Sequence, residues 1–435
     1  MLEQRGLWFR VSIFRVREAI ELMANIGIVG GGIAGLHLGH YLRQHDVTST
    51  IYCVQSPEEI ASGRIQNTVA HHNTTLERER QLGIHFWDAA EYGYVCHWHY
   101  FGGEHPLHFR GDFVHPSCCI DYRLLLPLLT EEFERRGGKV VLGRALEPSD
   151  IVRISERHDL VVICSGRGAL SRMFPVVDAL TPYDRPLRQL CAGFYNGVAR
   201  SRPVGVYWSV SPGAGELLEL PFTWREGPAT ALLFECLPGG PQDVFRNLDY
   251  EKDPKLFDRT VLEIVRNSFP KTFERIDPSE FGLTGPRELL RTAITPLVRE
   301  DYVELGNGKF AIALGDAHVL VDPIVGQGAN AASYSAFVVG ESIVRDHTYD
   351  RLFCERVAQR RAERLQGLTQ WANLMLQPPP PHVLELVGAM SQHQAVCDEF
   401  TQNFNAPERQ WEILATPERT QAFLRSRMSG GQPLP

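Results

Sequence analysis

The sequence lacks the features of a membrane-spanning, nucleic-acid-binding or disulfide-bonded protein. No run among its 435 residues is long and apolar enough to span a bilayer. The formal net charge is −8 and no basic block is present, which argues against nucleic acid as a partner. Nine cysteines include no Cys-x-x-Cys pair, which favours reduced thiols over a disulfide framework. We therefore expect a cytoplasmic protein with neither a membrane nor a nucleic-acid partner.

Residues 1–22 lack the unbroken apolar core and the small-residue cleavage site of a signal peptide, because Arg10 and Arg15 interrupt their apolar side chains. Met23 stands just before the first strand that the sequence predicts. We interpret residues 1–22 as an extension outside the folded core, such as an upstream translation start. A weakly amphipathic helix that lies on a partner is the alternative.

The motifs of metal-dependent and hydrolytic enzymes are also missing. His97 and His99 alternate onto one face of an expected strand, but no cysteine or carboxylate completes a metal-ligand spacing. Ser165 does not lie in Gly-x-Ser-x-Gly, the turn that carries the nucleophile of α/β-hydrolases. We therefore expect no metal site and no serine nucleophile.

What the sequence does contain begins with a glycine-rich turn after a short apolar strand. Asn25–Val29 is suited to a buried parallel strand, and Gly-x-Gly-x-x-Gly follows it before a segment with helical spacing. The first glycine forms the tight turn, the second lets the backbone approach a pyrophosphate, and the third lets helix and strand pack closely. The free N–H groups and positive dipole end of the helix favour two phosphates here. The expected dinucleotide-binding residues of this turn are Gly30, Gly32, Ile33, Ala34 and Gly35.

One part of this motif departs from the usual pattern. An acidic residue usually stands about 20 residues beyond the glycines and binds a ribose hydroxyl. Here residues 52–56 read Tyr-Cys-Val-Gln-Ser, and the first acid is Glu58. We expect Gln55 or Ser56 to take its place as a neutral hydrogen-bonding group.

A second glycine-bearing turn follows a strand in the later part of the chain. Phe310–Leu314 is fully apolar and delivers Gly315 and Asp316 to its carboxyl end, where ligands bind in open α/β sheets. Farther on, Gly326-Gln327-Gly328 opens an apolar helix and presents backbone N–H groups to an electron-rich group. The pyrimidine edge of a reduced flavin, which carries negative charge, fits this turn.

The order of the expected elements indicates an α/β protein with several lobes. Parallel strands stand near both ends of the core, an antiparallel sheet lies between about 189 and 237, and one long helix at Asp350–Trp371 is followed by two further helical pieces. The expected division is an extension at 1–22, a cofactor domain at 23–172 with inserted strands at about 65–115, a substrate domain at 173–290, the second part of the cofactor domain at 291–345, and a helical region at 346–435.

Taken together, these motifs resemble the flavoprotein aromatic hydroxylase superfamily, and more closely the oxygenase component of two-component styrene monooxygenases. The similarity extends over nearly the whole chain from Met23. Besides the two glycine turns, the residues that carry it are Asn67–His71, Asp121–Arg123, Val321–Ser333, Asn403–Asn405 and Pro407–Trp411. It implies a Rossmann-like FAD-binding domain of the para-hydroxybenzoate hydroxylase type, with a parallel sheet, joined to an antiparallel-sheet substrate domain and C-terminal helices.

The resemblance also implies roles for individual residues. The glycines of the first turn hold the pyrophosphate, and Asp316 binds a ribityl hydroxyl. Asn67 lies beside the flavin ring near the substrate and Pro323 lies against the ring, which makes these two the expected catalytic residues. The remaining cofactor-binding residues that it implies are Arg64 and Arg123 at the phosphate or ribityl region, and Gly326, Gly328, Ala329 and Asn330 around the pyrimidine edge.

The substrate pocket is implied in the same way. Its expected residues are Asn67, Val69, His71, Tyr94, His97, Ser117 and Ile324. The first six positions distinguish styrene-type from indole-type members of the family. Here they look like the styrene-type set, because the indole type carries Ser, Gln and Met at the first three.

The implied reaction is the epoxidation of styrene and related aryl alkenes, in which reduced FAD and O₂ form a C4a-hydroperoxide that attacks the vinyl bond. No second glycine-rich nucleotide turn is present, and Ser165-Gly166 stands where single-component relatives carry Asp-Gly. We therefore expect the isolated chain not to reduce FAD with NADH. The expected partner is a separate NADH-dependent flavin reductase that acts by diffusion or transient contact, and a homodimer is compatible with the sequence.

Two alternatives stay open from the sequence. The first is an indole epoxidase of the same fold, whose product leads to indigo. The second is a binding protein that uses the fold without flavin chemistry, as GDP-dissociation inhibitors do, although Asp316 and the turn at Gly326–Gly328 argue against it. Competition between styrene and indole, together with FAD titration, separates the three readings.

Overall fold

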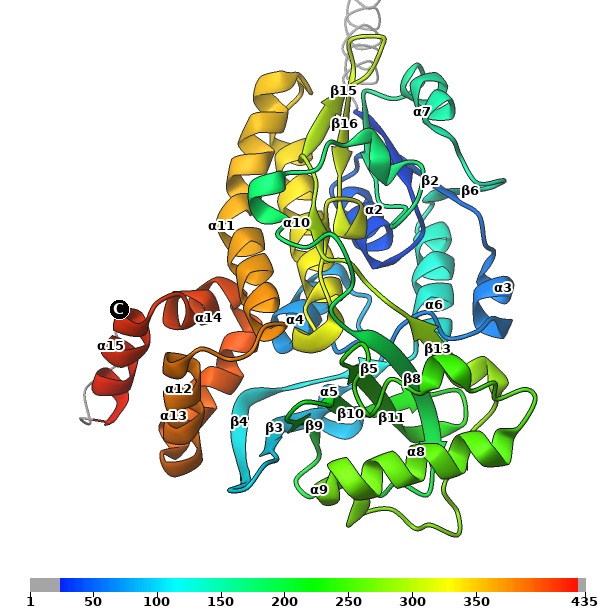
Figure 1. Cartoon of the computed structure of the whole chain (residues 1–435). Coiled ribbons are helices and arrows are strands. Elements are labelled where there is room, and N and C mark those ends of the chain that lie inside the picture. The colour runs from blue at the N-terminus through cyan, green and yellow to red at the C-terminus, as the bar shows by residue number, and fades with distance from the viewer. Residues whose placement is uncertain (1–23, 429–435) are drawn as a thin grey trace, which may run out of the picture.

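The computed structural model describes residues 24–428, so the expectations for residues 1–22 lie outside the described part of the chain. Two large sheets and the helices that pack on them make up this part (Figure 1). In the view of Figure 1 the parallel sheet lies above, the antiparallel sheet lies below, and the last helices lie at the left. The α/β architecture that the sequence predicts is therefore confirmed.

The first sheet is parallel except for one edge strand, and it includes both apolar runs that the sequence predicts as strands. Its spatial order is β15 (Tyr302–Glu304), β16 (Phe310–Ala313), β7 (Leu160–Ile163), β1 (Asn25–Val29), β2 (Thr48–Cys53) and β6 (Lys139–Leu142). Strand β1 pairs in parallel with β2 and β7, and Ile28 stands opposite both Ile51 and Val162. These three side chains are at most 1% exposed. Such burial is expected of parallel strands, which are covered on both faces.

Helices cover the two faces of this sheet. They are α2 (Ile33–Gln44), α6 (Tyr122–Arg135), α7 (Pro148–Ser155), α10 (Gly328–Arg345) and α11 (Arg351–Met375). The side chain of Asp121 accepts a hydrogen bond of 2.9 Å from the backbone N–H of Arg123 and so caps α6. The long helix α11 is fixed to the sheet by Arg361, whose fully buried guanidinium donates to the Ala313 carbonyl at 2.9 Å and to Asp301 at 2.6 Å.

The second sheet gathers strands from two distant parts of the chain. Its path is β12 (Gly282–Leu283), β8 (Gln189–Asn196), β11 (Gly227–Cys236), β10 (Gly215–Trp224), β9 (Gly205–Ser211), β3 (Tyr94–Phe101) and β4 (Leu107–Ser117), with β13 (Leu289–Thr292) on β8 and β5 (Cys119–Ile120) on β10. Most neighbours are antiparallel, but β3 runs parallel to β9, with His97 opposite Val206. The early strands expected as an insertion therefore extend the second sheet.

Helix α8 (Pro254–Ser268) covers the outer face of this sheet, with the short α9 (Pro270–Phe273) after it (Figure 1). Asp253 caps α8, because its side chain accepts a hydrogen bond from the Leu256 N–H at 2.9 Å. Phe257, Val261 and Val265 recur at helical spacing and are fully buried against the sheet.

The C-terminal region differs from the expectation of two helical pieces after the long helix. Within the described residues it holds α12 (Pro381–Gln392), α13 (Gln394–Gln402), α14 (Pro407–Leu414) and α15 (Pro417–Met428). Pro407 and Pro417 each stand at the first position of a helix, where the missing N–H costs nothing, and so divide the segment. Helix α13 packs on β4 so closely that a Cβ atom at Gly111 would lie 2.1 Å from the Thr401 hydroxyl.

The remaining elements are short. They include α3 (Pro57–Ser62), α4 (Asn73–Leu82), α5 (Ala89–Tyr92), β14 (Leu297–Val298) and β17 (Val319–Leu320), and 3₁₀ turns at Gly315–Ala317, Pro323–Val325 and Pro286–Glu288. In the part of the chain that the structure describes, no helix has the length and apolarity needed to cross a bilayer.

Candidate functional site

A cavity of about 870 Å³ opens at the carboxyl ends of the parallel strands, where open α/β sheets bind their ligands. Residues from both glycine-bearing turns line it. Of the residues that the sequence predicts for the site, the following line this cavity: Gly30, Gly32, Ile33, Ala34, Asn67, Val69, Asp316, Pro323, Gly326, Gly328 and Ala329. The structure therefore brings the two distant turns to one place.

The two turns are in contact as well as side by side. A Cβ atom at Gly315 would lie 3.1 Å from the Cβ of Ala34, which is the second residue of α2. Helices α2 and α10 both begin at the cavity, and neither has a side-chain cap or an acidic residue in its first turn. Their first N–H groups and positive dipole ends are therefore available to an anionic ligand.

The glycines of these turns divide into two kinds. A Cβ atom at Gly32, Gly326 or Gly328 would meet nothing within 4 Å, so these positions leave open space beside the cavity. By contrast, a Cβ at Gly35 would lie 2.0 Å from the Gly30 carbonyl oxygen, and Gly30 itself has φ +120°. Gly35 is a packing residue that lets α2 approach β1, whereas the open positions form a cradle that fits a dinucleotide.

Two carboxylates line the cavity, those of Asp316 and Glu147, and Asp316 is the one that the sequence predicts. It stands in the 3₁₀ turn after β16 and its side chain is exposed to the cavity. The surrounding protein raises the pKa of this carboxyl by desolvation, while Arg167 acts in the opposite direction. An acceptor in this position suits the hydroxyl groups of a ribityl chain.

The cavity residues that the sequence reading missed include Tyr122, Arg144 and Arg167. Arg144 follows β6 and is held by Asp150 at 2.8 Å, and Arg167 follows β7. Both arginines stand just past the carboxyl end of a parallel strand. That position is the signal that could have identified them.

The segment after β2, where an acidic residue is usual, contributes an uncharged side chain to the cavity. Gln55 lines the cavity and its Oε1 accepts a hydrogen bond from Gln66 at 3.2 Å. Ser56 has another role, because its hydroxyl and Glu59 form the capping box of α3. Of the two candidates named from the sequence, Gln55 is the one that the structure places at the cavity.

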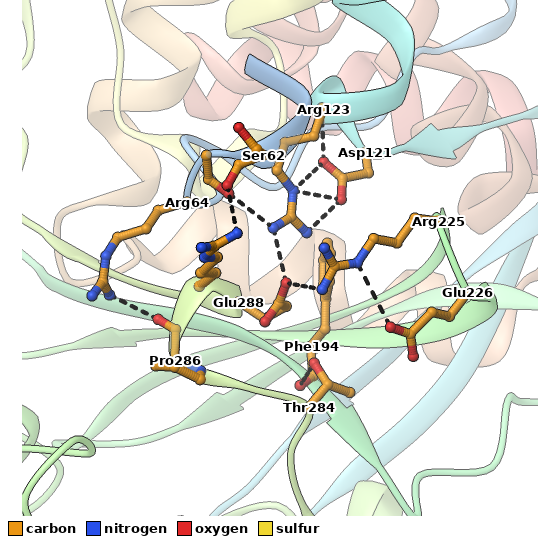
Figure 2. A network of polar contacts seen from close by, with 12 residues as sticks. Ser62, Arg64, Asp121, Arg123, Phe194, Arg225, Glu226, Thr284, Pro286 and Glu288 are labelled. Atoms are coloured by element: carbon orange, nitrogen blue, oxygen red, sulfur yellow. Dashed lines mark hydrogen bonds and ion pairs between the residues drawn. The ribbon is translucent and has the colours of Figure 1, made fainter. Parts of the chain in front are cut away.

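The two arginines expected at the phosphate or ribityl region do not line the cavity. Arg123 is buried and its guanidinium lies between two carboxylates, at 2.7 Å from Asp121 and 2.9 Å from Glu288 (Figure 2). Arg64 is largely exposed and donates to the Pro286 carbonyl at 2.7 Å (Figure 2). Partners within the protein hold both side chains in this structure, and their expected roles toward the cofactor stay predictions.

Asn330, expected at the pyrimidine edge, acts instead as a connector. Its Oδ1 accepts hydrogen bonds from the His72 N–H at 2.9 Å and the Thr75 hydroxyl at 2.7 Å. Its Nδ2 donates to the carbonyls of Ala70 and Gly326, at 2.9 and 3.0 Å. All its hydrogen-bonding capacity is used, so Asn330 fixes the turn at Gly326 rather than facing the cavity.

Of the expected substrate residues, Asn67 and Val69 line the cavity, whereas the others are buried outside it. Tyr94 and His97 stack with ring centroids 5.8 Å apart, and His97 also meets Phe113 at 4.8 Å and Phe404 at 4.4 Å. Burial lowers the pKa of His97 well below 6.5, so this imidazole is neutral. The buried residues are His71, Tyr94, His97, Ser117 and Ile324.

A pair of acids lies behind the second turn. Asp322 and Glu235 are both fully buried, and neither Glu235 oxygen has a donor partner. Burial, reinforced by Asp322, raises the pKa of Glu235 well above 4.5. Asp322 also caps the turn that carries Pro323, by accepting from the Ile324 N–H at 3.1 Å. Within residues 24–428, no group of three or more His, Cys, Asp or Glu side chains could hold a metal ion.

Comparisons with known proteins agree with this geometry. A family model described as the styrene monooxygenase A putative substrate binding domain matches residues 166–275. The styrene monooxygenase StyA of Pseudomonas fluorescens is 42% identical over 398 residues, which cover 91% of this chain and 96% of that protein. The styrene monooxygenase StyA of a Pseudomonas species gives the same values.

Solved structures show the same fold at low sequence identity. The flavin-dependent brominase Bmp2 has a TM-score of 0.61 and 15% identity, over 93% of this chain and 92% of that one. A probable FAD-dependent monooxygenase from Pseudomonas aeruginosa has a TM-score of 0.60 and 14% identity, over 91% of this chain and 100% of that one.

Proposed function

Because this chain belongs to the styrene monooxygenase family, we propose that it is the oxygenase component that uses reduced FAD and O₂ to epoxidise styrene and related aryl alkenes. It is an FAD-dependent monooxygenase. The expected division into domains and the roles of individual site residues are part of the same proposal.

One observation carries the proposal: two uncapped helix starts meet at one cavity, with Asp316 beside them. One helix start suits a pyrophosphate, and the other suits the negative pyrimidine edge of a flavin. The open space at Gly32, Gly326 and Gly328 lets a ligand approach the backbone N–H groups at both places. A protein that only bound an apolar ligand would need none of these features.

The chain's contribution to the reaction is binding, orientation and exclusion of water. Bound reduced FAD supplies the electrons that activate O₂. Asp316 and the glycine turns hold the cofactor, and Pro323 stands in the wall beside the second turn. Asn67, Val69 and Ile294 give a mixed but mainly apolar border on which an aryl alkene can be oriented.

The proposal includes a separate NADH-dependent flavin reductase as the source of reduced FAD. It is supported by the sequence, which has one dinucleotide motif and no second one. Indole remains the competing substrate, and we expect styrene to be preferred because Asn67, Val69 and His71 match the styrene-type pattern of the family. A cytoplasmic location and a homodimer stay predictions.

The test supplies chemically reduced FAD in air, with styrene and then indole, and measures each epoxide or its derivative. We expect styrene oxide as the main product in competition, and an absence of styrene oxide would refute the proposal. Asp316→Ala should weaken FAD binding about ten- to hundredfold, because a hydrogen bond to a charged group contributes about 1.5–3 kcal/mol. Asp184→Ala is the matched control, since Asp184 is exposed and does not line the cavity.

A further inference from the structure

A buried carboxylate, Glu79 on α4, has no part in the roles described so far. Its side chain is 6% exposed, and Oε1 lies 2.6 Å from Nδ1 of His71. Two more imidazoles are near, with His85 Nδ1 at 3.6 Å and His37 Nε2 at 3.8 Å. A carboxylate enclosed in this way is stable only when protonated donors face it.

The charges of this cluster follow from its contacts. Burial by itself raises the pKa of Glu79, but His71, His85 and His37 outweigh it and bring that pKa to about 2. Burial lowers the pKa of His37 to about 3, so His37 is neutral near pH 7. His71 and His85 are the imidazoles that lie closest to the Glu79 carboxylate, and the charge of Arg78 also acts on it.

His71 also connects the carboxylate with the cavity. Its second nitrogen, Nε2, lies 2.7 Å from the hydroxyl of Tyr122, and Tyr122 lines the cavity. Burial raises the pKa of Tyr122 well above 10, with Glu79 and Asp316 adding to the effect, so the phenol keeps its proton. The hydrogen bonds thus run without a break from Glu79 through His71 to the cavity wall.

This arrangement accommodates His71 in both of its protonation states. When the imidazole is neutral, Nδ1–H donates to Glu79 and Nε2 accepts the Tyr122 O–H. When it is a cation, Nε2–H donates to the Tyr122 oxygen and frees the phenolic O–H to donate into the cavity. The hydrogen bonds that join His71 to Glu79 and to Tyr122 are kept in both states.

We propose that Glu79, His71 and Tyr122 store one proton and deliver it to the cavity during each turnover. In the delivery step the Tyr122 hydroxyl proton passes to an acceptor in the cavity, and the Nε2 proton of His71 replaces it. His71 changes from cation to neutral imidazole, Tyr122 remains a phenol and Glu79 remains a carboxylate. The store refills from solvent when the cofactor leaves the cavity.

This role rests on the proposed function, whose stoichiometry requires a proton. When reduced FAD enters as its monoanion, one O₂ and one alkene give oxidised FAD, one epoxide and one water, and the sum consumes one proton. Burial keeps other groups beside the triad from supplying it: it lowers the pKa of His72 to about 3 and raises that of Cys118 to about 12. The titratable groups that face the triad are His37, His72, Arg78, His85, Cys118 and Asp316.

The first test needs no cofactor and uses ¹⁵N-histidine NMR of the FAD-free protein, with the His71 signals assigned by their loss in His71→Gln. We expect Nδ1 of His71 to stay protonated from pH 5 to 9 while Nε2 gains and loses its proton. Tyr122→Phe should shift the midpoint of the Nε2 titration. A His71 ring that stays in one protonation state over this range would overturn the proposal.

The second test measures styrene epoxidation with chemically reduced FAD. Tyr122→Phe should lower the rate about a hundredfold, since general acids contribute 10²–10⁴-fold. Small weak acids added at constant pH should restore part of that rate, which a purely structural role of the hydroxyl would not allow. Tyr349→Phe is the control: its hydroxyl donates to the Ile343 carbonyl at 3.2 Å outside the cavity, and its rate should stay within twofold.

The outcomes separate the two proposals. If the unmodified protein forms no epoxide, the proposed function fails, whereas the NMR titration still tests the proton store. If the unmodified protein forms epoxide and Tyr122→Phe is as fast, or is slow without rescue by weak acids, the proton store is overturned alone.

Discussion

Arg123 offers the sharpest test of the structure, because sequence resemblance places it at the cofactor and the structure places it between buried carboxylates. Its side chain is 6% exposed, and those of Asp121 and Glu288 are 5% and 3% exposed. Asp121 and Arg123 begin α6, whereas Glu288 stands beside β13 of the second sheet, 165 residues away. The ion pair therefore joins the start of α6, which covers the parallel sheet, to the second sheet.

We predict that Arg123→Met destabilises the protein by about 3–5 kcal/mol. Removing one partner of a buried ion pair leaves uncompensated charge, which costs about this amount. Methionine keeps most of the apolar stem of arginine. The loss of stability is therefore due to the missing guanidinium rather than to a new cavity. Arg225 remains 3.4 Å from Glu288 and offsets part of the charge, which favours the lower half of the range.

Urea unfolding of the FAD-free protein, followed by circular dichroism, measures the change. Arg64→Met is the control, because Arg64 and its partner Glu251 are 58% and 62% exposed and such surface pairs contribute about 0–1 kcal/mol. Both variants should bind FAD within about twofold of the unmodified protein at temperatures where they are folded. An unchanged unfolding curve for Arg123→Met, with FAD affinity lowered tenfold or more, would show that Arg123 reaches the cofactor and would refute the structural role.

Three further predictions concern the site. Gly35→Ala should destabilise the fold by about 1–3 kcal/mol, because its Cβ would lie 2.0 Å from the Gly30 carbonyl oxygen. Gly32→Ala should fold normally, because its Cβ would meet no atom within 4 Å, but it should bind FAD more weakly. Thermal unfolding and FAD titration of both variants measure these effects. The raised pKa of Glu235 means that its contribution to stability is complete below about pH 4.5 and is lost as the pH rises toward the folded-state pKa. The stability of Glu235→Gln relative to the unmodified protein should therefore rise by up to about 1.4 kcal/mol per pH unit above pH 4.5. A difference in unfolding free energy between the two proteins that stays constant from pH 5 to 8 contradicts this prediction. Finally, the isolated chain with FAD and NADH should show no loss of flavin absorbance under anaerobic conditions, and rapid bleaching would contradict a separate reductase.

Local patterns identified the parallel strands and the two turns. Asn25–Val29 is a strand with the bounds that the sequence predicts, because continuous apolar character is a property of the segment itself. Gly32 and Asp316 meet at one cavity because strands of one parallel sheet end at a common edge. Features of this kind depend on neighbouring residues and on general rules of sheet topology.

Side-chain partners from distant segments could not be read in this way. No sequence pattern near Arg123 indicates that Glu288 is its partner. Likewise, no pattern near His71 indicates that its two nitrogens form hydrogen bonds with Glu79 and Tyr122. Both side chains had been assigned to the ligand by resemblance. The structure gives them protein partners instead, because a buried charge or imidazole has to be satisfied wherever the fold brings a complement to it.

The parallel pairing of β3 with β9 limits how this protein can be divided or recombined. The matched segment 166–275 contains β8 to β11 but not the strand that covers the free edge of β9. A fragment or chimera made from that segment alone would expose a row of unpaired backbone donors and acceptors, which invites aggregation. Exchanges between relatives should therefore carry residues 94–117 together with the later strands, although more than seventy residues of another lobe separate them in the chain.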